Sequence, residues 1–415
     1  MIRTLIVDWG GVLMRTVDIR PRMAWERRLG LPPGDLADLF FRGRAWERAL
    51  RGEATLDDVW TEVAHHLELS EGETAALSQD FWAGDRLDQD LVALIRDLRR
   101  QGLRTALLSN HTSHLPGVLA DLGLDDLFDV EVVSALEGAT KPDPLIYRRT
   151  LERLETPPPE AVFVDDQWAN VEAARRLGMV GLRFQGIAHL RRKLAAAGLP
   201  VETPSPDPVP GIRAVIFDWG GVFAPLTFFK HTREWEERLG LVEGTLNQVL
   251  WGRKWKQLEI GAISPEAFDE HVAQGLGLPD REAVHQFYRA YYADDHLDHR
   301  VLDAAQALRG RYRVALLTNA FPDHARLVQE RYGFDPRAEF DLYVNSAEVG
   351  LAKPDPAIYR LVLDRLGIAP GEAVFLDDMV RNTDAAGALG IHAIVFTDAE
   401  AGLKDLAALL GHPIP

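Results

Sequence analysis

Apolar positions along the chain follow two alternating patterns. Short runs of β-branched and other apolar residues indicate buried strands, and the longer segments between them, in which apolar residues recur every three or four positions, indicate helices. This alternation predicts an α/β fold built on Rossmann-like, doubly wound parallel sheets. The predicted strands are 5–8, 104–110, 131–135, 161–166 and 181–184 in the first half, and 214–218, 314–319, 342–346, 373–378 and 393–396 in the second.

The pattern occurs twice because the sequence repeats itself. Five blocks recur in one order at offsets of 209–212 residues, far beyond the period of solenoid repeats, which indicates tandem duplication of a whole domain. The matching pairs are RTLIVDWGGVL (3–13) with RAVIFDWGGVF (213–223), WERRLGL (25–31) with WEERLGL (235–241), TALLSN (105–110) with VALLTN (314–319), TKPDPLIYR (140–148) with AKPDPAIYR (352–360), and AVFVDD (161–166) with AVFLDD (373–378).

A proline-rich segment separates the two copies. Residues 199–211 hold five prolines and no apolar periodicity, which is typical of an extended, semi-rigid linker. We therefore expect domains at 1–198 and 212–415. In each domain a long helical segment follows the first strand, at about 14–92 and 224–300, where it could close over the end of the sheet.

Composition and charge narrow the class of protein. The chain of 415 residues is 47% hydrophobic and 26% charged, the profile of a soluble, core-forming protein, and no stretch approaches the roughly 20 apolar residues of a membrane span. The absence of cysteine excludes disulfides, thiolate catalysis and cysteine-based zinc sites. The N-terminal residues run straight into a predicted strand and do not resemble a signal peptide, so we expect a cytoplasmic protein.

The charge of the chain argues against a nucleic-acid partner. The net charge is −17, and no dense tract of Lys or Arg interrupts the acidic excess. Lysine is scarce, with 7 Lys against 39 Arg, yet both copies of the KPDP loop keep one, Lys141 and Lys353. A compact ammonium charge would explain this retention better than a solvated surface position would.

Chemically capable side chains gather at the predicted strand ends. The carboxyl ends of parallel strands meet at one edge, which is where such sheets bind ligands. Carboxylates and backbone carbonyls suit Mg²⁺, and a hydroxyl, an amide and an ammonium donate to anionic oxygens. Together they indicate phosphoryl transfer through an aspartyl-phosphate. The residues are Asp8, Ser109, Asn110, Lys141, Asp165 and Asp166 in the first copy, and Asp218, Thr318, Asn319, Lys353, Asp377 and Asp378 in the second.

Each motif alone has an ordinary structural explanation. Asp at a strand end is commonly a turn or helix cap, Ser-Asn is turn chemistry, and KPDP is a proline-rich turn. The shared order of the motifs and their repetition in both copies favour the functional interpretation.

The four motifs DWGGV, LLSN or LLTN, KPDP, and FVDD or FLDD resemble those of the haloacid dehalogenase (HAD) superfamily, in two copies with helical caps that look C1-type. The resemblance implies that Asp8 and Asp218 are nucleophiles and Mg²⁺ ligands. It implies further that the carbonyls of Gly10 and Gly220 and the paired aspartates complete the metal site, that Ser109, Thr318, Lys141 and Lys353 hold the phosphoryl group, and that Asn170 and Asn382 support the helix beside the metal.

The caps and two tryptophans supply further candidates for substrate contact. The cap sequences FRGRAWERALRGE and WGRKWKQLEIGAI align as Gly-Arg-x-Trp, so Arg44 and Trp46, with Arg253 and Trp255, could reach the substrate. Packing of these tryptophans within the cap is the alternative. Trp9 and Trp219 lie inside the nucleophile turn and could line the pocket or pack in the core. His111 has no histidine counterpart in the second copy, so a difference between the sites is first expected there and in the caps.

One departure from the family pattern is serious. Family phosphatases usually carry Asp-x-Asp, whose second Asp protonates the leaving group and then activates water, but these positions hold Gly10 and Gly220. Phosphatases of the Asp-x-Gly type, similar to alpha-glucose-1-phosphate phosphatase, are one explanation. A 2-haloacid dehalogenase is a second, disfavoured by the paired aspartates, and a catalytically inert site in one or both copies is a third.

The sequence therefore predicts a Mg²⁺-dependent phosphatase acting on a small phosphorylated metabolite. We hypothesise that the missing acid selects leaving groups that depart as stable anions, such as anomeric sugar phosphates, acyl phosphates and diphosphates. One inert or regulatory copy, or a non-catalytic phosphometabolite-binding scaffold, remains the alternative. Oligomeric state and pathway are not specified by the sequence.

Overall fold

The computed structural model describes residues 1–226 and 231–414 and divides the chain into two compact units. The units are Met1–Pro204 and Ser205–Pro415, so the division falls inside the proline-rich segment 199–211. The insertion expected at about 224–300 includes residues 227–230, which lie outside the described residues.

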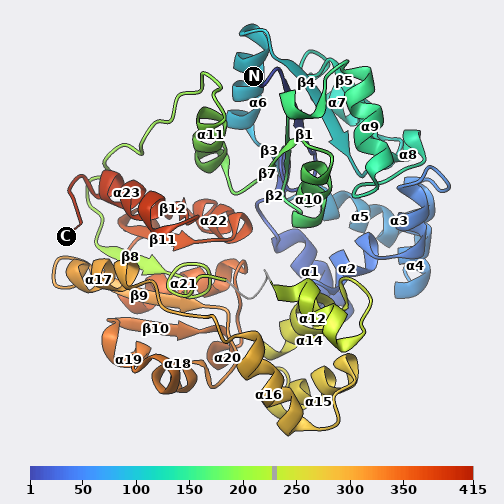
Figure 1. Cartoon of the computed structure of the whole chain (residues 1–415). Coiled ribbons are helices and arrows are strands. Elements are labelled where there is room, and N and C mark those ends of the chain that lie inside the picture. The colour runs from blue at the N-terminus through green and yellow to red at the C-terminus, as the bar shows by residue number, and fades with distance from the viewer. Residues whose placement is uncertain (227–230, 415) are drawn as a thin grey trace. The chain divides into compact units, whose positions relative to one another are not determined.

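Both units are built on a five-stranded parallel sheet (Figure 1). The strand orders are β5-β4-β1-β6-β7 and β10-β9-β8-β11-β12, and every neighbouring pair within the two sheets is parallel. These sheets confirm the predicted fold class. The strands are β1 Thr4–Val7, β4 Arg104–Ser109, β5 Val130–Val133, β6 Ala161–Asp165 and β7 Val180–Arg183, then β8 Ala214–Phe217, β9 Arg313–Thr318, β10 Leu342–Asn345, β11 Ala373–Asp377 and β12 His392–Val395.

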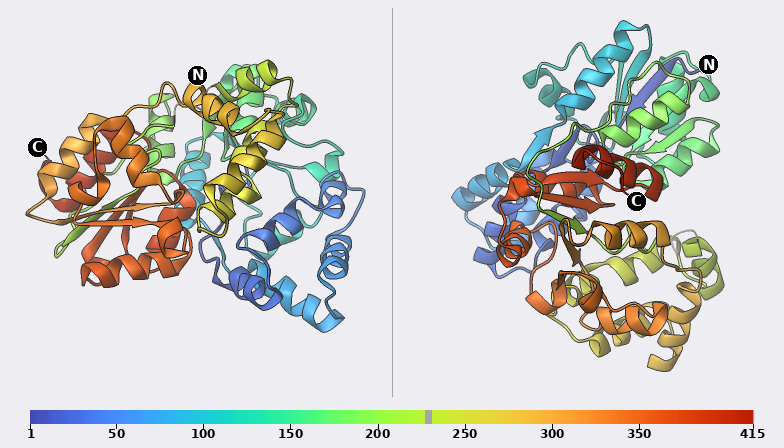
Figure 2. Two further views of the ribbon diagram at one scale, coloured as in Figure 1. Left: turned by 90° about the horizontal axis from the view of Figure 1, so that it is seen from below. Right: turned by 90° about the vertical axis from the view of Figure 1, so that its left-hand side faces the viewer.

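Helices cover both faces of each sheet, which is why the strands are apolar at nearly every position (Figures 1 and 2). In β1, Leu5 and Val7 belong to one hydrophobic core and Ile6 to the opposite one. One face of the first sheet packs on α6 Gln89–Arg100, α7 Leu115–Asp121 and α11 Ile187–Ala196, and the other on α9 Pro144–Arg153 and α10 Trp168–Arg176. In the second unit the corresponding helices are α17 His299–Leu308, α18 His324–Tyr332 and α23 Ala399–Leu410, then α21 Pro356–Leu366 and α22 Val380–Gly387.

A helical insertion with its own hydrophobic core follows the first strand of each unit. A helical pattern runs from Trp46 to Leu67 in the sequence, but the structure interrupts it at 50–55, where the Thr55 hydroxyl accepts a hydrogen bond from the Asp58 amide and begins a new helix. The helices are α1 Arg20–Leu29, α2 Asp35–Phe41, α3 Arg44–Ala49, α4 Leu56–Leu67 and α5 Glu71–Trp82, then α12 Thr232–Leu239, α13 Thr245–Trp251, α14 Arg253–Leu258, α15 Pro265–Leu276 and α16 Arg281–Tyr291.

A small antiparallel pair, which the sequence pattern did not predict, brackets the first insertion. Strand β2 Met14–Thr16 pairs with β3 Asp85–Leu87. Each strand is three residues long and lacks the alternation of apolar and polar positions that identifies longer strands. The pair ties the two ends of the insertion together.

Each insertion also rests closely on its own sheet domain through a glycine. A Cβ atom on Gly52 would lie 2.3 Å from the carbonyl oxygen of Ala135, and one on Gly261 would lie 2.6 Å from that of Ala347. Both glycines have positive φ, +76° and +69°. Ala135 and Ala347 belong to short helices, α8 Ser134–Glu137 and α20 Ser346–Val349, that directly follow edge strands. The insertions therefore contact the edge of the sheet where the carboxyl ends of the strands lie.

None of the helices in the described part of the chain combines the length and the apolar character that crossing a bilayer requires.

Candidate active site

Three carboxylates converge at the carboxyl ends of neighbouring strands in each unit. Asp8 follows β1, while Asp165 and Asp166 stand at the end of β6, which pairs directly with β1. One oxygen from each of the three lies within 4.8 Å of the others. The second unit repeats this cluster with Asp218, Asp377 and Asp378. The parallel register accounts for the convergence, because it brings strand ends separated by most of a domain of sequence to one edge.

A buried lysine is clamped between two of these carboxylates. The ammonium nitrogen of Lys141 lies 2.7 Å from Asp8 Oδ1 and 2.7 Å from Asp165 Oδ2, and its side chain is 1% exposed. In the second unit, Lys353 lies 2.7 Å from Asp218 Oδ1 and 2.6 Å from Asp377 Oδ2. The KPDP lysine predicted to join the site from a loop therefore occupies its centre in both copies.

The asparagine after β4 holds the lysine loop in place. The Asn110 side chain donates to the carbonyl oxygen of Lys141 at 2.8 Å and accepts from its amide at 2.7 Å. Asn319 makes the same two bonds to Lys353, both at 2.8 Å. Because both the oxygen and the nitrogen of each side-chain amide are hydrogen-bonded to the lysine backbone, this geometry indicates a positioning role. Substrate contact by Asn110 and Asn319 stays a prediction.

The first aspartate of each pair is surrounded by donors. Asp165 accepts from the amide of Gln167 at 2.8 Å, from the Asn170 side chain at 3.1 Å to each oxygen, and from Lys141. Asn170 in turn belongs to α10, whose first turn is fixed by a hydrogen bond from the Tyr147 hydroxyl to the Asn170 carbonyl at 3.0 Å. The second unit repeats these bonds with Asp377, Met379, Asn382, Lys353 and Tyr359. Sequence reasoning missed the tyrosine, although both copies carry it in the block KPDPxIYR.

The pKa shifts of the charged groups reflect the crowding of negative charge in the site. Burial raises the pKa of Asp8 from 3.8 to about 7, Lys141 opposes the rise, and repulsion from Asp165 and Asp166 adds to it. Burial would lower the pKa of Lys141, but attraction to Asp8 and Asp165 outweighs it and raises that pKa. The pKa of Asp218 is likewise raised well above its ordinary value by burial, against the opposing charge of Lys353.

The cluster has the donor chemistry of a hard divalent cation site. Three carboxylates offer only oxygen ligands, and one ammonium cannot neutralise all of them. The turn after Asp8 also leaves room for the third carboxylate: a Cβ on Gly11, which has φ +77°, would lie 2.6 Å from the Asp166 carboxyl carbon. A Cβ on Gly221, which has φ +75°, would likewise lie 2.5 Å from the Asp378 carboxyl carbon. The residues present therefore fit Mg²⁺.

We expect Gly11→Ala to weaken Mg²⁺ binding in the first copy by about tenfold or more and to destabilise the fold by about 1–3 kcal/mol. The added methyl group would push the Asp166 carboxylate aside and strain a left-handed backbone position. Gly10→Ala is the matched control, because a Cβ there meets nothing within 4 Å. Calorimetric titration with Mg²⁺ and urea unfolding of both variants measure the effects. Equal behaviour of the two variants would contradict this role for Gly11.

The predicted phosphoryl-binding hydroxyls stand at the end of the adjacent strand. Ser109 ends β4 and Thr318 ends β9, each 2% exposed. The turn that follows Ser109 is tied to the edge strand by Ser134, whose hydroxyl accepts from the His111 amide and donates to its carbonyl, both at 3.1 Å. Ser346 does the same for Ala320 in the second unit. Sequence reasoning missed these serines too, although EVVSA and LYVNS place them at equivalent positions.

The tryptophan candidates are buried to different degrees. Trp9 and Trp219 are 5% and 8% exposed and belong to the hydrophobic cores of their sheets. Trp46 is 8% exposed in the core of the insertion and meets His111 edge to face, with ring centroids 6.1 Å apart. Trp255 is half-buried and packs on Trp251 and Phe268, while Arg44 and Arg253 are exposed. Their contacts with a substrate stay predictions.

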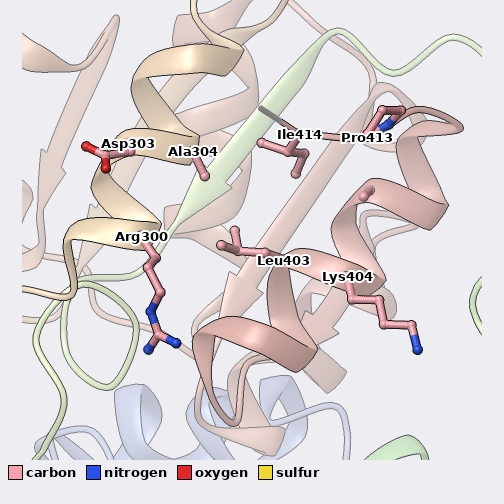
Figure 3. Close-up of a pocket in the computed structure, with 8 residues that line it drawn as sticks. Arg300, Asp303, Ala304, Leu403, Lys404, Pro413 and Ile414 are labelled. Carbon is pink, nitrogen blue, oxygen red and sulfur yellow. The ribbon is translucent and has the colours of Figure 1, made fainter.

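A separate cavity of about 460 Å³ opens in the second unit between α17 and α23 (Figure 3). It is lined by Arg300, Asp303, Ala304, Leu403, Lys404, Ala407, Pro413 and Ile414. None of these residues belongs to the carboxylate–lysine cluster. Convergent polar chemistry, and not cavity size, therefore identifies the candidate active site.

Comparison with known families agrees with this geometry. The family model for haloacid dehalogenase-like hydrolases matches residues 2–178 and again residues 212–390. The chain belongs to the haloacid dehalogenase-like hydrolases and carries two tandem copies of the family's domain. The predicted superfamily is thereby confirmed.

Several individual proteins are similar to this chain over a segment about as long as one of its two copies. The sesquiterpene phosphatase of Aspergillus oryzae is 32% identical over 44% of this chain and 89% of its own length. A phosphatase of Mycobacterium tuberculosis is 30% identical over 43% of this chain and 85% of its own. A crystal structure of a HAD family enzyme from Bacteroides thetaiotaomicron, complexed with magnesium and inorganic phosphate, is 26% identical over 44% of this chain and 93% of its own, with a TM-score of 0.38.

Two larger relatives match over only part of their length. The mouse acyl-CoA dehydrogenase family member 10 is 32% identical over 49% of this chain but 19% of its own length. The pig bifunctional epoxide hydrolase 2 is 28% identical over 48% of this chain and 39% of its own.

Proposed function

We propose that this chain is a Mg²⁺-dependent phosphatase that hydrolyses a small phosphorylated metabolite through an aspartyl-phosphate, with one site in each copy. The proposal rests on one arrangement that occurs in both copies. In each, an aspartate at the position of the nucleophile lies beside a buried lysine and a pair of aspartates. Relatives named as phosphatases, covered by this chain over most of their length, support the same chemistry.

In this proposal each residue of the site has its own role. Asp8 attacks phosphorus, and Lys141 binds the phosphoryl oxygens and holds Asp8 in position. Ser109 donates its hydroxyl to the same group. Asp165, which accepts hydrogen bonds from Gln167, Asn170 and Lys141, mainly orients Lys141. In the second copy the corresponding residues are Asp218, Lys353, Thr318 and Asp377.

The metal would be held by Asp8, Asp166 and the carbonyl of Gly10, and in the second copy by Asp218, Asp378 and the carbonyl of Gly220. Binding by Asp165 and Asp377, also predicted from the sequence, would compete with their hydrogen bonds to the lysine and asparagine. Bound Mg²⁺ would neutralise charge on the carboxylates and on the phosphoryl group.

The absence of the second Asp restricts the substrate. General acid help is typically worth about 10²–10⁴-fold, so a site without it favours leaving groups that depart as stable anions. Anomeric sugar phosphates, acyl phosphates and diphosphates meet that requirement. The first copy carries Gly10 at this position, and Leu50 occupies the place in its cap where the second copy has a carboxyl group.

We expect the first copy, isolated by Asp218→Asn, to hydrolyse phosphate esters at rates that fall steeply as the leaving-group pKa rises. Gly10→Asp should flatten this dependence and speed alkyl esters by about tenfold or more, because the new carboxyl group enters open space at a residue whose φ is negative. Phosphate release from a series of aryl and alkyl phosphates with Mg²⁺ measures both effects. A flat dependence before the substitution would mean that a proton donor already exists in that copy. No phosphate release from any ester by the unsubstituted chain would refute the proposed function.

A further inference from the structure

The two copies agree at every motif of the candidate site but differ in charge at its border. Alignment of Arg44-x-Trp46 with Arg253-x-Trp255 puts Glu259 where the first copy has Leu50. The alignment of Asn170 with Asn382 puts Arg381 where the first copy has Ala169. One carboxylate on the insertion and one guanidinium on the sheet domain thus distinguish the second site from the first.

The fold itself does not favour a carboxyl group at this position. In the first copy, Leu50 packs against the hydrophobic core of the insertion. Glu259 directly follows the last residue of α14, where the negative end of the helix dipole disfavours a carboxylate. Burial raises the pKa of Glu259 to about 7, although Arg381, Trp255, Lys256 and Lys353 all act to lower it. A perturbed, destabilising carboxyl group at the border of a site is a functional candidate.

The turn that carries Glu259 lies against the edge of the candidate site. Two residues later, Gly261 approaches the carbonyl of Ala347 so closely that a Cβ would lie 2.6 Å from it. The neighbouring Ser346 hydroxyl accepts from the amide of Ala320 at 2.9 Å, and Ala320 stands two residues after Thr318, the predicted phosphoryl-binding residue. A close backbone approach and a serine hydrogen bond therefore link this turn to the loop that follows Thr318.

Positively charged groups of both the insertion and the sheet domain act on Glu259. Its pKa responds to the charge of Lys353, the lysine clamped between Asp218 and Asp377, and to that of Arg381 on α22, which follows Asp378. The Trp255 side chain hydrogen-bonds to it, and Lys256 contributes a third positive charge from α14 itself. Glu259 therefore lies near the positively charged groups of the second site, on a turn that packs against the sheet domain.

We propose that Glu259 is the proton donor of the second copy and takes the role of the acid that Gly220 cannot supply. The inference rests on the proposed phosphatase function. As Asp218 bonds to phosphorus and the bond from phosphorus to the leaving oxygen breaks, the Glu259 carboxyl proton passes to that oxygen and releases an alcohol. Water then attacks the aspartyl-phosphate and gives a proton to the Glu259 carboxylate, which regenerates the acid, the Asp218 carboxylate and free phosphate. The second copy can thereby accept alkyl phosphates, whose alkoxide leaving groups require protonation.

The first test uses the full chain with Asp8→Asn, so that only the second copy acts. Adding Glu259→Gln is expected to slow hydrolysis of an alkyl phosphate by about 10²–10⁴-fold and to change hydrolysis of p-nitrophenyl phosphate by less than about tenfold. Glu270→Gln, an exposed carboxyl group on α15 of the same insertion, should leave both rates unchanged. An equal loss for both esters would overturn the donor role and assign Glu259 to substrate binding or to closure of the insertion.

A second measurement is independent of turnover. Carbon-13 NMR of the chain with labelled glutamate should show a carboxyl group that titrates near 7, absent from Glu259→Gln and retained in Glu270→Gln. The signal that disappears in Glu259→Gln belongs to Glu259. If that signal titrates in the ordinary range of glutamate, Glu259 is ionised at neutral pH and the proposal fails. A signal near 7 in a chain that hydrolyses none of the esters would refute the phosphatase function and, with it, the donor role. A normal titration in a chain that does hydrolyse them would refute the donor role alone.

Discussion

Replacing Asp8 and Asp218 together by Asn is expected to reduce phosphatase activity by about 10⁴-fold or more, because neither copy would keep a nucleophile. Asn preserves the size of the side chain but cannot form the aspartyl-phosphate. Each single variant should retain the activity of the intact copy. Steady-state kinetics on one good substrate, compared among the parent and the three variants, measure the losses.

Titration with beryllofluoride and Mg²⁺ supplies a count of working sites. The parent chain should bind two equivalents, each single variant one and the double variant none. Asp121→Asn, an exposed carboxylate on α7, is the matched control and should behave as the parent does. One equivalent in the parent would mean that one copy is inert or regulatory, and none would favour a scaffold. Loss of all activity in one single variant would assign catalysis to that copy alone.

Replacing Lys141 by Met is expected to destabilise the first unit by about 3–5 kcal/mol in the absence of divalent cations. The ammonium group, 1% exposed, lies 2.7 Å from oxygens of both Asp8 and Asp165, so its removal leaves buried carboxylates without a counter-charge. Lys353→Met should have the same effect on the second unit. Because the chain has two units, urea unfolding should be followed as two transitions, of which each variant shifts a different one.

Three comparisons separate this charge effect from a loss of packing. Lys193→Met, at an exposed position on α11, should leave stability nearly unchanged. Burial raises the pKa of Asp8 from 3.8 to about 7, so the folded unit binds a proton more readily than the unfolded chain does and its stability falls as pH rises through this range. The penalty of Lys141→Met should therefore be smaller at pH 5 than at pH 8. Added Mg²⁺ should restore part of the stability that Lys141→Met removes. A loss of stability that depends on neither pH nor Mg²⁺ would indicate an effect of packing alone.

Much of the architecture follows from local sequence patterns. The ten strands of the two sheets lie at or within a few residues of their predicted positions, because strands covered on both faces appear as continuous apolar runs. The pattern did not predict the short β2–β3 pair, and it joined α3 to α4 across the turn that ends at Thr55. Three-residue strands and single-turn breaks are too short to carry a periodic signal.

The roles within the site depended on contacts that no local pattern contains. The sequence predicts Asp165 as a metal ligand and Asn110 as a substrate contact, and both stay predictions. The structure adds the hydrogen bonds by which both residues hold Lys141. Tyr147 and Ser134, which brace the site, carry no chemical signature in the sequence and were missed. Their importance comes from the partner that each contacts across 23 residues of chain.

The sequence by itself determined the duplication, the parallel sheets, the family and the residues that meet at the strand ends. These features depend on apolar runs, repeated motifs and their spacing, which can be read directly along the chain. Only the tertiary structure decided that the lysine stands between two carboxylates, that Gly11 makes room for Asp166, and that the turn carrying Glu259 packs against the second sheet domain. Those facts depend on distances and burial between segments remote in sequence, which hydrophobic periodicity does not encode.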